Sequence, residues 1–208
     1  NSSLNVMYDT VARSMTHGVM GSTPSAKLDK VKFLCPVPGY DRHFAITEFF
    51  GIEMISVEMT NEGPDVAKIK ELVKDPMVKG MFCVPKYSNP QGITFSAETV
   101  KRIANLDTAA DDFRIIWDNA YCVHDLTDTT DELLNIFDVL PEKNKNMVVE
   151  VASTSKISYP GAGVACIATS VENVKEILKR LTVQAISYDK VNMLRHVKFF
   201  KDVDGIKN

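Results

Sequence analysis

The chain has 208 residues, of which 45% are hydrophobic and 25% are charged, and its formal net charge is −3. This composition is typical of a globular protein with one large core or two small ones. The slight negative charge and the lack of a basic stripe exclude a protein that binds the nucleic-acid backbone, so no nucleic-acid partner is expected. No apolar run is long enough to cross a bilayer and no signal peptide is recognised, so no membrane partner is expected.

The four cysteines occur singly, and most of them lie within apolar segments. This spacing favours buried, reduced thiols over a disulfide framework or a metal site, so we predict a cytoplasmic protein without a metal. The sequence starts at Asn1 and stops shortly after Asp204 and Gly205. Both ends look cut, and we therefore expect a domain taken from a longer protein.

Helices and strands are predicted to alternate along the chain. The N-capping residue types at positions 1–3 open a first helix, whose apolar face runs from Leu4 to Met15. Predicted strands cover residues 32–35, 53–59, 78–84, 113–117, 148–152 and 164–168. Predicted helices cover residues 45–50 and 133–140, and others begin at Pro64, after Ser96 and after Ser170. The alternation predicts an α/β fold, a three-layer α/β/α sandwich around a mostly parallel mixed sheet.

Polar residues that suit catalysis follow several of these strands directly. In α/β folds, ligands gather beyond the carboxyl ends of the strands. Lys156 is the most informative of these residues, because it lies between small hydroxylated residues after a strand and before the turn at Pro160 and Gly161. An amine in such a place can attack a carbonyl carbon and form a Schiff base. The other residues in this position are Tyr40, His43, Asn89, Asp118 and Tyr121.

Asp118 and Tyr121 place a carboxylate and a phenol one short turn apart after the strand at residues 113–117. An isolated aspartate is more often a turn residue or helix cap, and an isolated tyrosine is more often a packing residue. As a pair they can hold a heteroaromatic nitrogen protonated and hydrogen-bond a ring oxygen. His124, three residues after Tyr121, is not assigned a role.

On these residues the chain resembles the large domain of a fold-type I aminotransferase, a pyridoxal-phosphate enzyme, and more narrowly the MocR-like class I/II subgroup. The specific matches are the Asp118 and Tyr121 pair and Ser153-x-x-Lys156, with Asn89-Pro90-x-Gly92 as a weaker one. The resemblance implies that residues 1–186 form the cofactor-binding large domain. It also implies that residues 187–208 begin the connection to a C-terminal small domain outside this chain.

The resemblance also implies the roles around the cofactor ring. Lys156 resembles the lysine that holds the cofactor as a Schiff base and later moves the substrate proton. Asp118 resembles the carboxylate that pairs with the pyridine nitrogen. Tyr121 and Asn89 resemble the two groups that hydrogen-bond the phenolic oxygen. Tyr40 stands where the family keeps an aromatic stacked on the ring.

The remaining roles concern the cofactor's surroundings and its phosphate. His43 resembles a histidine that supports the aspartate from behind. Asn1, Ser2 and Ser3 lie where the family has its phosphate-binding loop, at a helix N-terminus that attracts anions. Ser153 and Ser155 are further phosphate ligands by position. The chain departs from the family at Val164, where class I relatives usually carry an arginine that grips the phosphate.

The predicted activity is transfer of an amino group between an amino acid, with aspartate or alanine as donors, and a 2-oxo acid in a homodimer. Two alternatives stay open: a cofactor-sensing domain of a winged-helix transcriptional regulator, and a lyase or decarboxylase on the same scaffold. A third, a plain α/β binding domain, is disfavoured because five candidate positions agree in following strands. An upstream winged helix would favour the regulator. Because the chain starts within the expected phosphate loop and ends before any small domain, we expect it to bind the cofactor weakly and to be inactive by itself.

Overall fold

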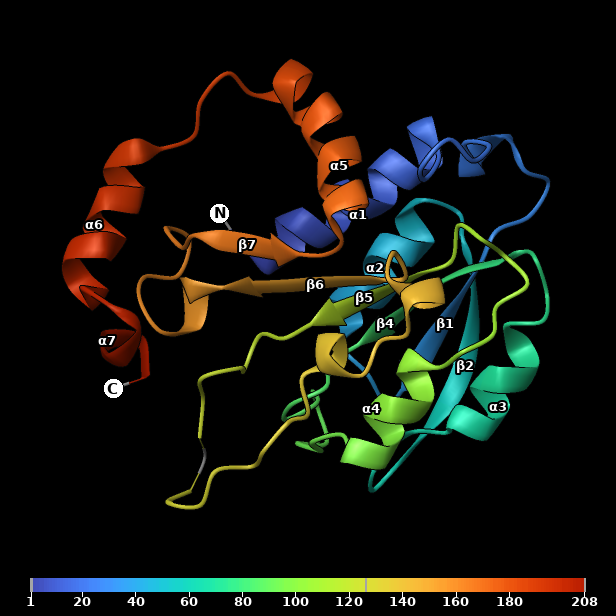
Figure 1. The fold of residues 1–208 in the computed structure, drawn as a ribbon, viewed down its shortest axis with the longest axis horizontal. Coiled ribbons are helices and arrows are strands. Elements are labelled where there is room, and N and C mark those ends of the chain that lie inside the picture. Colours follow the sequence, from blue (N-terminus) through green and yellow to red (C-terminus); the bar gives the residue numbers. More distant parts are fainter. Residues whose placement is uncertain (1, 126, 208) are drawn as a thin grey trace.

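The computed structural model describes residues 2–125 and 127–207. These residues form one seven-stranded sheet in the order β3-β2-β1-β4-β5-β6-β7 (Figure 1). Five neighbouring strands are parallel, while β3 runs antiparallel to β2 and β7 antiparallel to β6. The sheet is therefore mixed and mostly parallel, which confirms the prediction. The strands are β1 (Lys32–Val37), β2 (Glu53–Thr60), β3 (Gly63–Pro64), β4 (Val78–Cys83), β5 (Arg114–Asp118), β6 (Val148–Ser153) and β7 (Ala165–Ala168).

Helices cover both faces of the sheet and make the fold a three-layer sandwich (Figure 1). One core packs against α1 and α2, and the other packs against α3 and α4. Helix α5 lies beside α1, where Gln184 Nε2 donates to Asp9 Oδ2 at 3.1 Å. The α-helices are α1 (Ser3–His17), α2 (Asp41–Phe49), α3 (Val66–Leu72), α4 (Ala97–Ala104), α5 (Val171–Gln184), α6 (Lys190–Phe200) and α7 (Val203–Lys207). Single 3₁₀ turns are η1 (Ser25–Lys27), η2 (Ile136–Asp138), η3 (Glu142–Asn144) and η4 (Thr154–Lys156).

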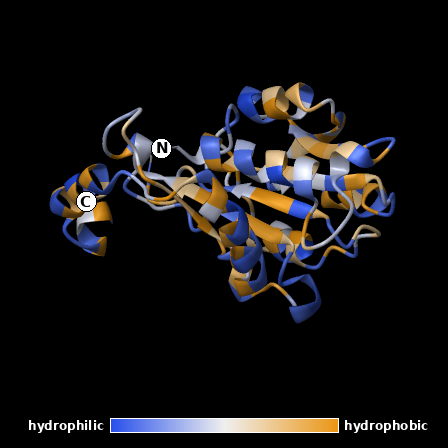
Figure 2. Cartoon of the chain, turned by 90° about the horizontal axis from the view of Figure 1, so that it is seen from above, coloured by the Kyte–Doolittle hydropathy of each residue, from blue (hydrophilic) through white to orange (hydrophobic). Residues whose placement is uncertain are grey.

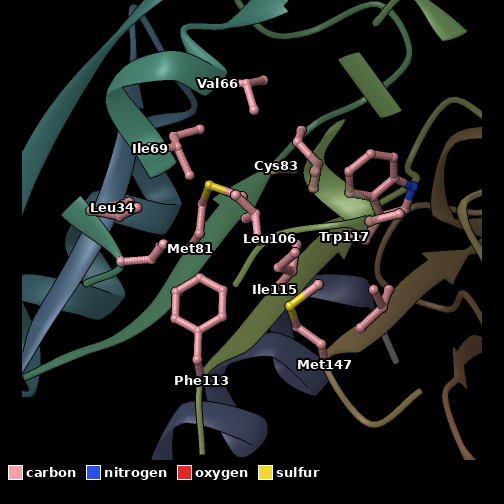
Figure 3. Packing of buried hydrophobic residues seen from close by; sticks show 14 of the residues in the cluster. Leu34, Val66, Ile69, Met81, Cys83, Leu106, Phe113, Ile115, Trp117 and Met147 are labelled. Carbon is pink, nitrogen blue, oxygen red and sulfur yellow. The ribbon is translucent and has the colours of Figure 1, made fainter. Parts of the chain in front are cut away.

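The larger core fixes the strands that carry the site residues. Met81, Ile115 and Trp117 are almost completely buried between the sheet and helices α3 and α4 (Figure 3). Burying a large apolar side chain contributes about 1.5–3 kcal/mol to folding, so β4 and β5 are held firmly. Because Asp118 is the last residue of β5, this packing also fixes its position.

The four cysteines are free thiols, but only two of them are buried. Burial raises the pKa of the Cys35 thiol to about 12 and raises the pKa of Cys83 as well, so both are unreactive core residues. Cys122 and Cys166 are exposed, and the prediction of buried thiols is wrong for this pair. Cys122 follows the end of β5 in a turn and Cys166 lies on the edge strand β7, where an apolar sequence context does not ensure burial.

The predicted helix at residues 133–140 is wrong, because only the 3₁₀ turn η2 forms there. Asn135 caps that turn by accepting a hydrogen bond from the Phe137 N–H at 3.2 Å. Apolar residues of this segment pack on the larger core without helical periodicity. Pro64 lies in β3, and α3 begins after Asp65, whose side chain accepts from the Lys68 N–H at 3.1 Å.

Helices α6 and α7 were not predicted, and they lie to one side of the sheet beyond the β6–β7 hairpin (Figures 1 and 2). Figure 2 shows apolar and polar residues interspersed on these helices. Val191, Leu194 and Val197 of α6 are exposed. Both helices fall within residues 187–208, whose assignment as the start of a domain connection stays a prediction. Within the described residues, no helix combines the length and the apolar character needed to span a membrane.

Candidate active site

A cavity of about 220 Å³ lies at the carboxyl ends of the central strands. Of the predicted residues, His43 does not line it but contacts Asp118 from behind, and Asn1 lies outside the described residues. The topology brings the others together because β5 and β6 are neighbouring parallel strands that end at the same edge. The predicted residues that line the cavity are Ser2, Ser3, Tyr40, Asn89, Asp118, Tyr121, Ser153, Ser155 and Lys156.

Asp118 is a buried carboxylate with one oxygen satisfied and one without a partner. Its Oδ2 accepts a hydrogen bond from His43 Nε2 at 3.0 Å, and both side chains are at most 5% exposed. The His43 ring is held in turn by Phe82, on which it stacks at 4.5 Å, and by the edge-on ring of Tyr40 at 5.2 Å. Among the described residues, Asp118 Oδ1 has no hydrogen-bond partner. Because a buried oxygen without a donor is costly, this side of the carboxylate suits an N–H group of a bound molecule.

The amine of Lys156 is held by Tyr121. Its Nζ donates to Tyr121 Oη at 2.8 Å and lies 4.0 Å from the centre of the same ring. Lys156 belongs to η4, which follows β6 directly, and its side chain is exposed. Tyr121 therefore holds the nucleophilic amine of Lys156 at the mouth of the cavity, at the carboxyl end of the sheet.

Hydroxyl groups and a helix N-terminus make up the other end of the cavity. Ser2 is the N-cap of α1, and its Oγ accepts from the Asn5 N–H at 3.4 Å. Ser3 is the first residue of that helix, and Ser153 Oγ donates to Ser155 Oγ at 3.2 Å. Free N–H groups and the helix dipole favour an anion at this place. The arrangement suits a phosphate group.

No arginine is among the described residues that line this cavity. Val164, which stands at the family's arginine position, lines a separate cavity that it shares with Arg13 and Tyr188. Its backbone pairs with Thr154, because the Thr154 N–H donates to Val164 O at 2.9 Å. The departure seen in the sequence therefore places Val164 outside this cavity, whose described polar lining includes Ser2, Ser3, Ser153 and Ser155.

His124, to which the sequence assigns no role, is a neighbour of the site. Its ring meets the Tyr121 ring edge-on at 5.6 Å, and neither ring nitrogen has a hydrogen-bond partner of normal geometry among the described residues. The pKa of His124 is lowered, mainly by burial and further by the charge of Lys156, while the Lys156 backbone partly offsets this by raising the pKa. The ring is therefore biased toward its neutral form beside the amine. Its spacing of three residues from Tyr121 was the only signal in the sequence.

Comparison with known proteins decides the family. A model of the aspartate aminotransferase family matches residues 1–208 of the chain. The chain belongs to this family. Membership confirms the predicted resemblance to a fold-type I, pyridoxal-phosphate aminotransferase, whereas the narrower MocR-like assignment stays a prediction.

The relatives support the same fold over the whole chain. The aspartate aminotransferase of Corynebacterium glutamicum is 47% identical over 208 residues, which are 99% of this chain and 48% of that protein. A crystal structure of an aspartate transaminase from that species has a TM-score of 0.95 at 47% identity and covers 99% of this chain and 49% of the solved one. The alpha-aminoadipate aminotransferase of Thermus thermophilus, solved with N-(5'-phosphopyridoxyl)-L-leucine, shares the fold at 18% identity, with a TM-score of 0.76 over 99% of this chain and 50% of that one. The chain spans about half the length of the curated relatives it matches.

Proposed function

We propose that this protein is a pyridoxal-phosphate-dependent aminotransferase that moves an amino group between an amino acid and a 2-oxo acid. One observation carries the proposal: the Lys156 amine, hydrogen-bonded to Tyr121, shares a cavity with Asp118, a buried carboxylate that has one free oxygen. The family membership and the 47% identical C. glutamicum relative support it.

The residues of the cavity fit the cofactor at both ends. Asp118 Oδ1 would accept from the pyridine N–H of the bound cofactor, while His43 keeps the carboxylate in place through Oδ2. Tyr121 and Asn89 would hold the phenolic oxygen, and Tyr40 would cover the ring. Ser2, Ser3 and the N-terminus of α1 would hold the phosphate.

Each of three residues has a separate role in the proposed reaction: Lys156, Asp118 and Tyr121. When bound, pyridoxal phosphate withdraws electrons from the α-carbon of an attached amino acid and so makes loss of the α-proton feasible. Asp118 keeps the pyridine nitrogen protonated, which this electron withdrawal requires. The Lys156 amine would hold the cofactor as a nucleophile and, when free, would move the α-proton as general base and acid. Tyr121 keeps that amine within reach between these roles.

We propose aspartate as the donor, which the name of the C. glutamicum relative supports, with alanine as the second choice from the sequence resemblance. The homodimer, implied by the resemblance, and the cytoplasmic location, predicted from the cysteine spacing, are proposals as well.

A transamination assay tests the function directly. The purified full-length protein is incubated with pyridoxal phosphate, one amino acid at a time and 2-oxoglutarate, and glutamate formation is measured. Amino-group transfer from aspartate supports the proposal. Loss of the amino acid without glutamate formation points to a lyase, and cofactor binding without turnover of any amino acid points to the regulatory domain.

A further inference from the structure

The loop that carries Lys156 is closed at its base but exposed at its tip. We call residues 154–164 the lysine loop. At its base the Thr154 N–H donates to Val164 O, and the Val164 N–H donates to Thr154 Oγ1, both at 2.9 Å. At its tip, Tyr159 and Pro160 are exposed. The base alone therefore leaves the middle of the loop without support from the sheet.

Helix α6 contacts the lysine loop through two polar side chains and one aromatic ring. His196 Nε2 lies 2.8 Å from Ser158 Oγ, and Asn192 Nδ2 donates to Ala162 O at 2.7 Å. Residues 192 and 196 are four apart and so lie on one face of the helix. The two contacts therefore place this face against the loop, and Figure 1 shows α6 on the side of the sheet where β6 connects to β7.

The His196 ring is held by a contact within its own helix as well as by the loop. Its Nδ1 lies 2.9 Å from Asn192 O, and the residue is 8% exposed. A carbonyl oxygen only accepts, so Nδ1 carries the proton and Nε2 faces the Ser158 hydroxyl. Ser158 Oγ also lies 2.9 Å from Thr154 O. Because Ser158 has one hydroxyl hydrogen, it donates either to His196 Nε2 or to Thr154 O. These close polar contacts connect α6 through His196 and Ser158 to the first residue of the turn that holds Lys156.

We propose that His196 is a positioning residue that holds the lysine loop, and with it the Lys156 amine, in reactive geometry. The inference rests on the proposed role of Lys156. An amine displaced by about 1 Å from its productive place loses much of its reaction rate, so a loop that carries such a group needs support beyond its base. The Phe199 ring of α6 lies 6.1 Å from the Tyr159 ring at the exposed tip of the loop, whereas Asn192 and His196 hold the loop through polar contacts on either side of that tip.

A pair of amide substitutions separates this role from simple packing. In His196→Asn the side-chain amide lies near the former position of His196 Nδ1 and cannot reach Ser158. In His196→Gln the side chain is longer, and its amide reaches the former position of Nε2. In the cofactor-free protein, we expect amide hydrogen exchange in residues 157–164 to rise about threefold to tenfold in His196→Asn. We expect the rate of labelling of Lys156 by pyridoxal phosphate, trapped with borohydride, to fall by a similar factor. His196→Gln keeps both rates near those of the unaltered protein.

Two further variants complete the design. Ser158→Ala should reproduce His196→Asn, and the double variant should be no worse than either single one, because both remove the same contact. His17→Asn, at the exposed end of α1, is the control and changes neither rate. Equal effects of His196→Asn and His196→Gln, or additive effects with Ser158→Ala, would overturn the proposal. If the unaltered protein takes no label on Lys156, the proposed function fails, and the exchange measurement alone then decides whether α6 supports the loop.

Discussion

Asp118→Asn tests the role of the buried carboxylate with the smallest change of shape. The amide keeps an oxygen that can accept from His43 Nε2, now 3.0 Å from Asp118 Oδ2, so the residue stays packed at the end of β5. It loses the negative charge that holds a pyridine nitrogen protonated. Replacing a charged hydrogen bond by a neutral one lowers the free energy of unfolding by about 1 kcal/mol. Turnover should fall by roughly 10²–10³-fold, the loss expected when one preorganised electrostatic contact is removed.

Asp112→Asn is the matched control for this prediction. Asp112 is also a poorly exposed carboxylate, but it lies just before β5, at the opposite end from Asp118, where its Oδ1 is 2.7 Å from Lys79 Nζ. The same substitution should lower unfolding free energy by a similar amount, measured by urea denaturation, and leave turnover unchanged. The reasoning is refuted if Asp118→Asn retains turnover within about threefold of Asp112→Asn, because the carboxylate is then only a structural residue.

Two other predictions concern the amine and the anion-binding end of the cavity. Tyr121→Phe keeps the ring beside the Lys156 amine but removes the 2.8 Å hydrogen bond, so turnover should fall about tenfold. Borohydride should still fix the cofactor on Lys156. Loss of that label would show instead that the phenol is required for attachment of the cofactor. Ser2→Ala should weaken binding of pyridoxal phosphate about tenfold and leave binding of pyridoxal, which has no phosphate, unchanged, as followed by absorbance titration. Ser170→Ala removes the matching N-cap of α5 and should change neither affinity; equal effects of both serine variants would reduce the role of Ser2 to helix capping.

The positions of the central site residues could be predicted because they follow strands. Asp118 ends β5, and Lys156 follows β6 by one turn. In a parallel sheet such residues meet at one edge, so the order of strands and helices in the sequence was enough to group them. N-caps also gave accurate helix starts, since the side chains of Ser96 and Ser170 accept from backbone N–H groups, as the sequence pattern indicates.

The missed features depend on contacts that a sequence pattern does not contain. The apolar residues at positions 133–140 pack on the larger core around a single 3₁₀ turn, so apolar spacing was misread as a helix. Helix α6 begins with a usable signal, because Asp189 accepts from the Asn192 N–H at 2.9 Å. Its role depends on the pairing of His196 with Ser158, which lie 38 residues apart in the sequence. His124 likewise gains its interest only from the neighbours that the fold gives it.

The central claim is that Lys156 is the lysine that binds pyridoxal phosphate covalently. Incubation of the purified protein with pyridoxal phosphate, followed by borohydride reduction, proteolysis and mass spectrometry, tests this claim most directly. The structure predicts one dominant phosphopyridoxyl adduct, on Lys156. Among the described residues that line the cavity containing Asp118, Lys156 is the only lysine, and Tyr121 holds its amine. A dominant adduct on any other lysine, or labelling spread evenly over exposed lysines, would contradict the account.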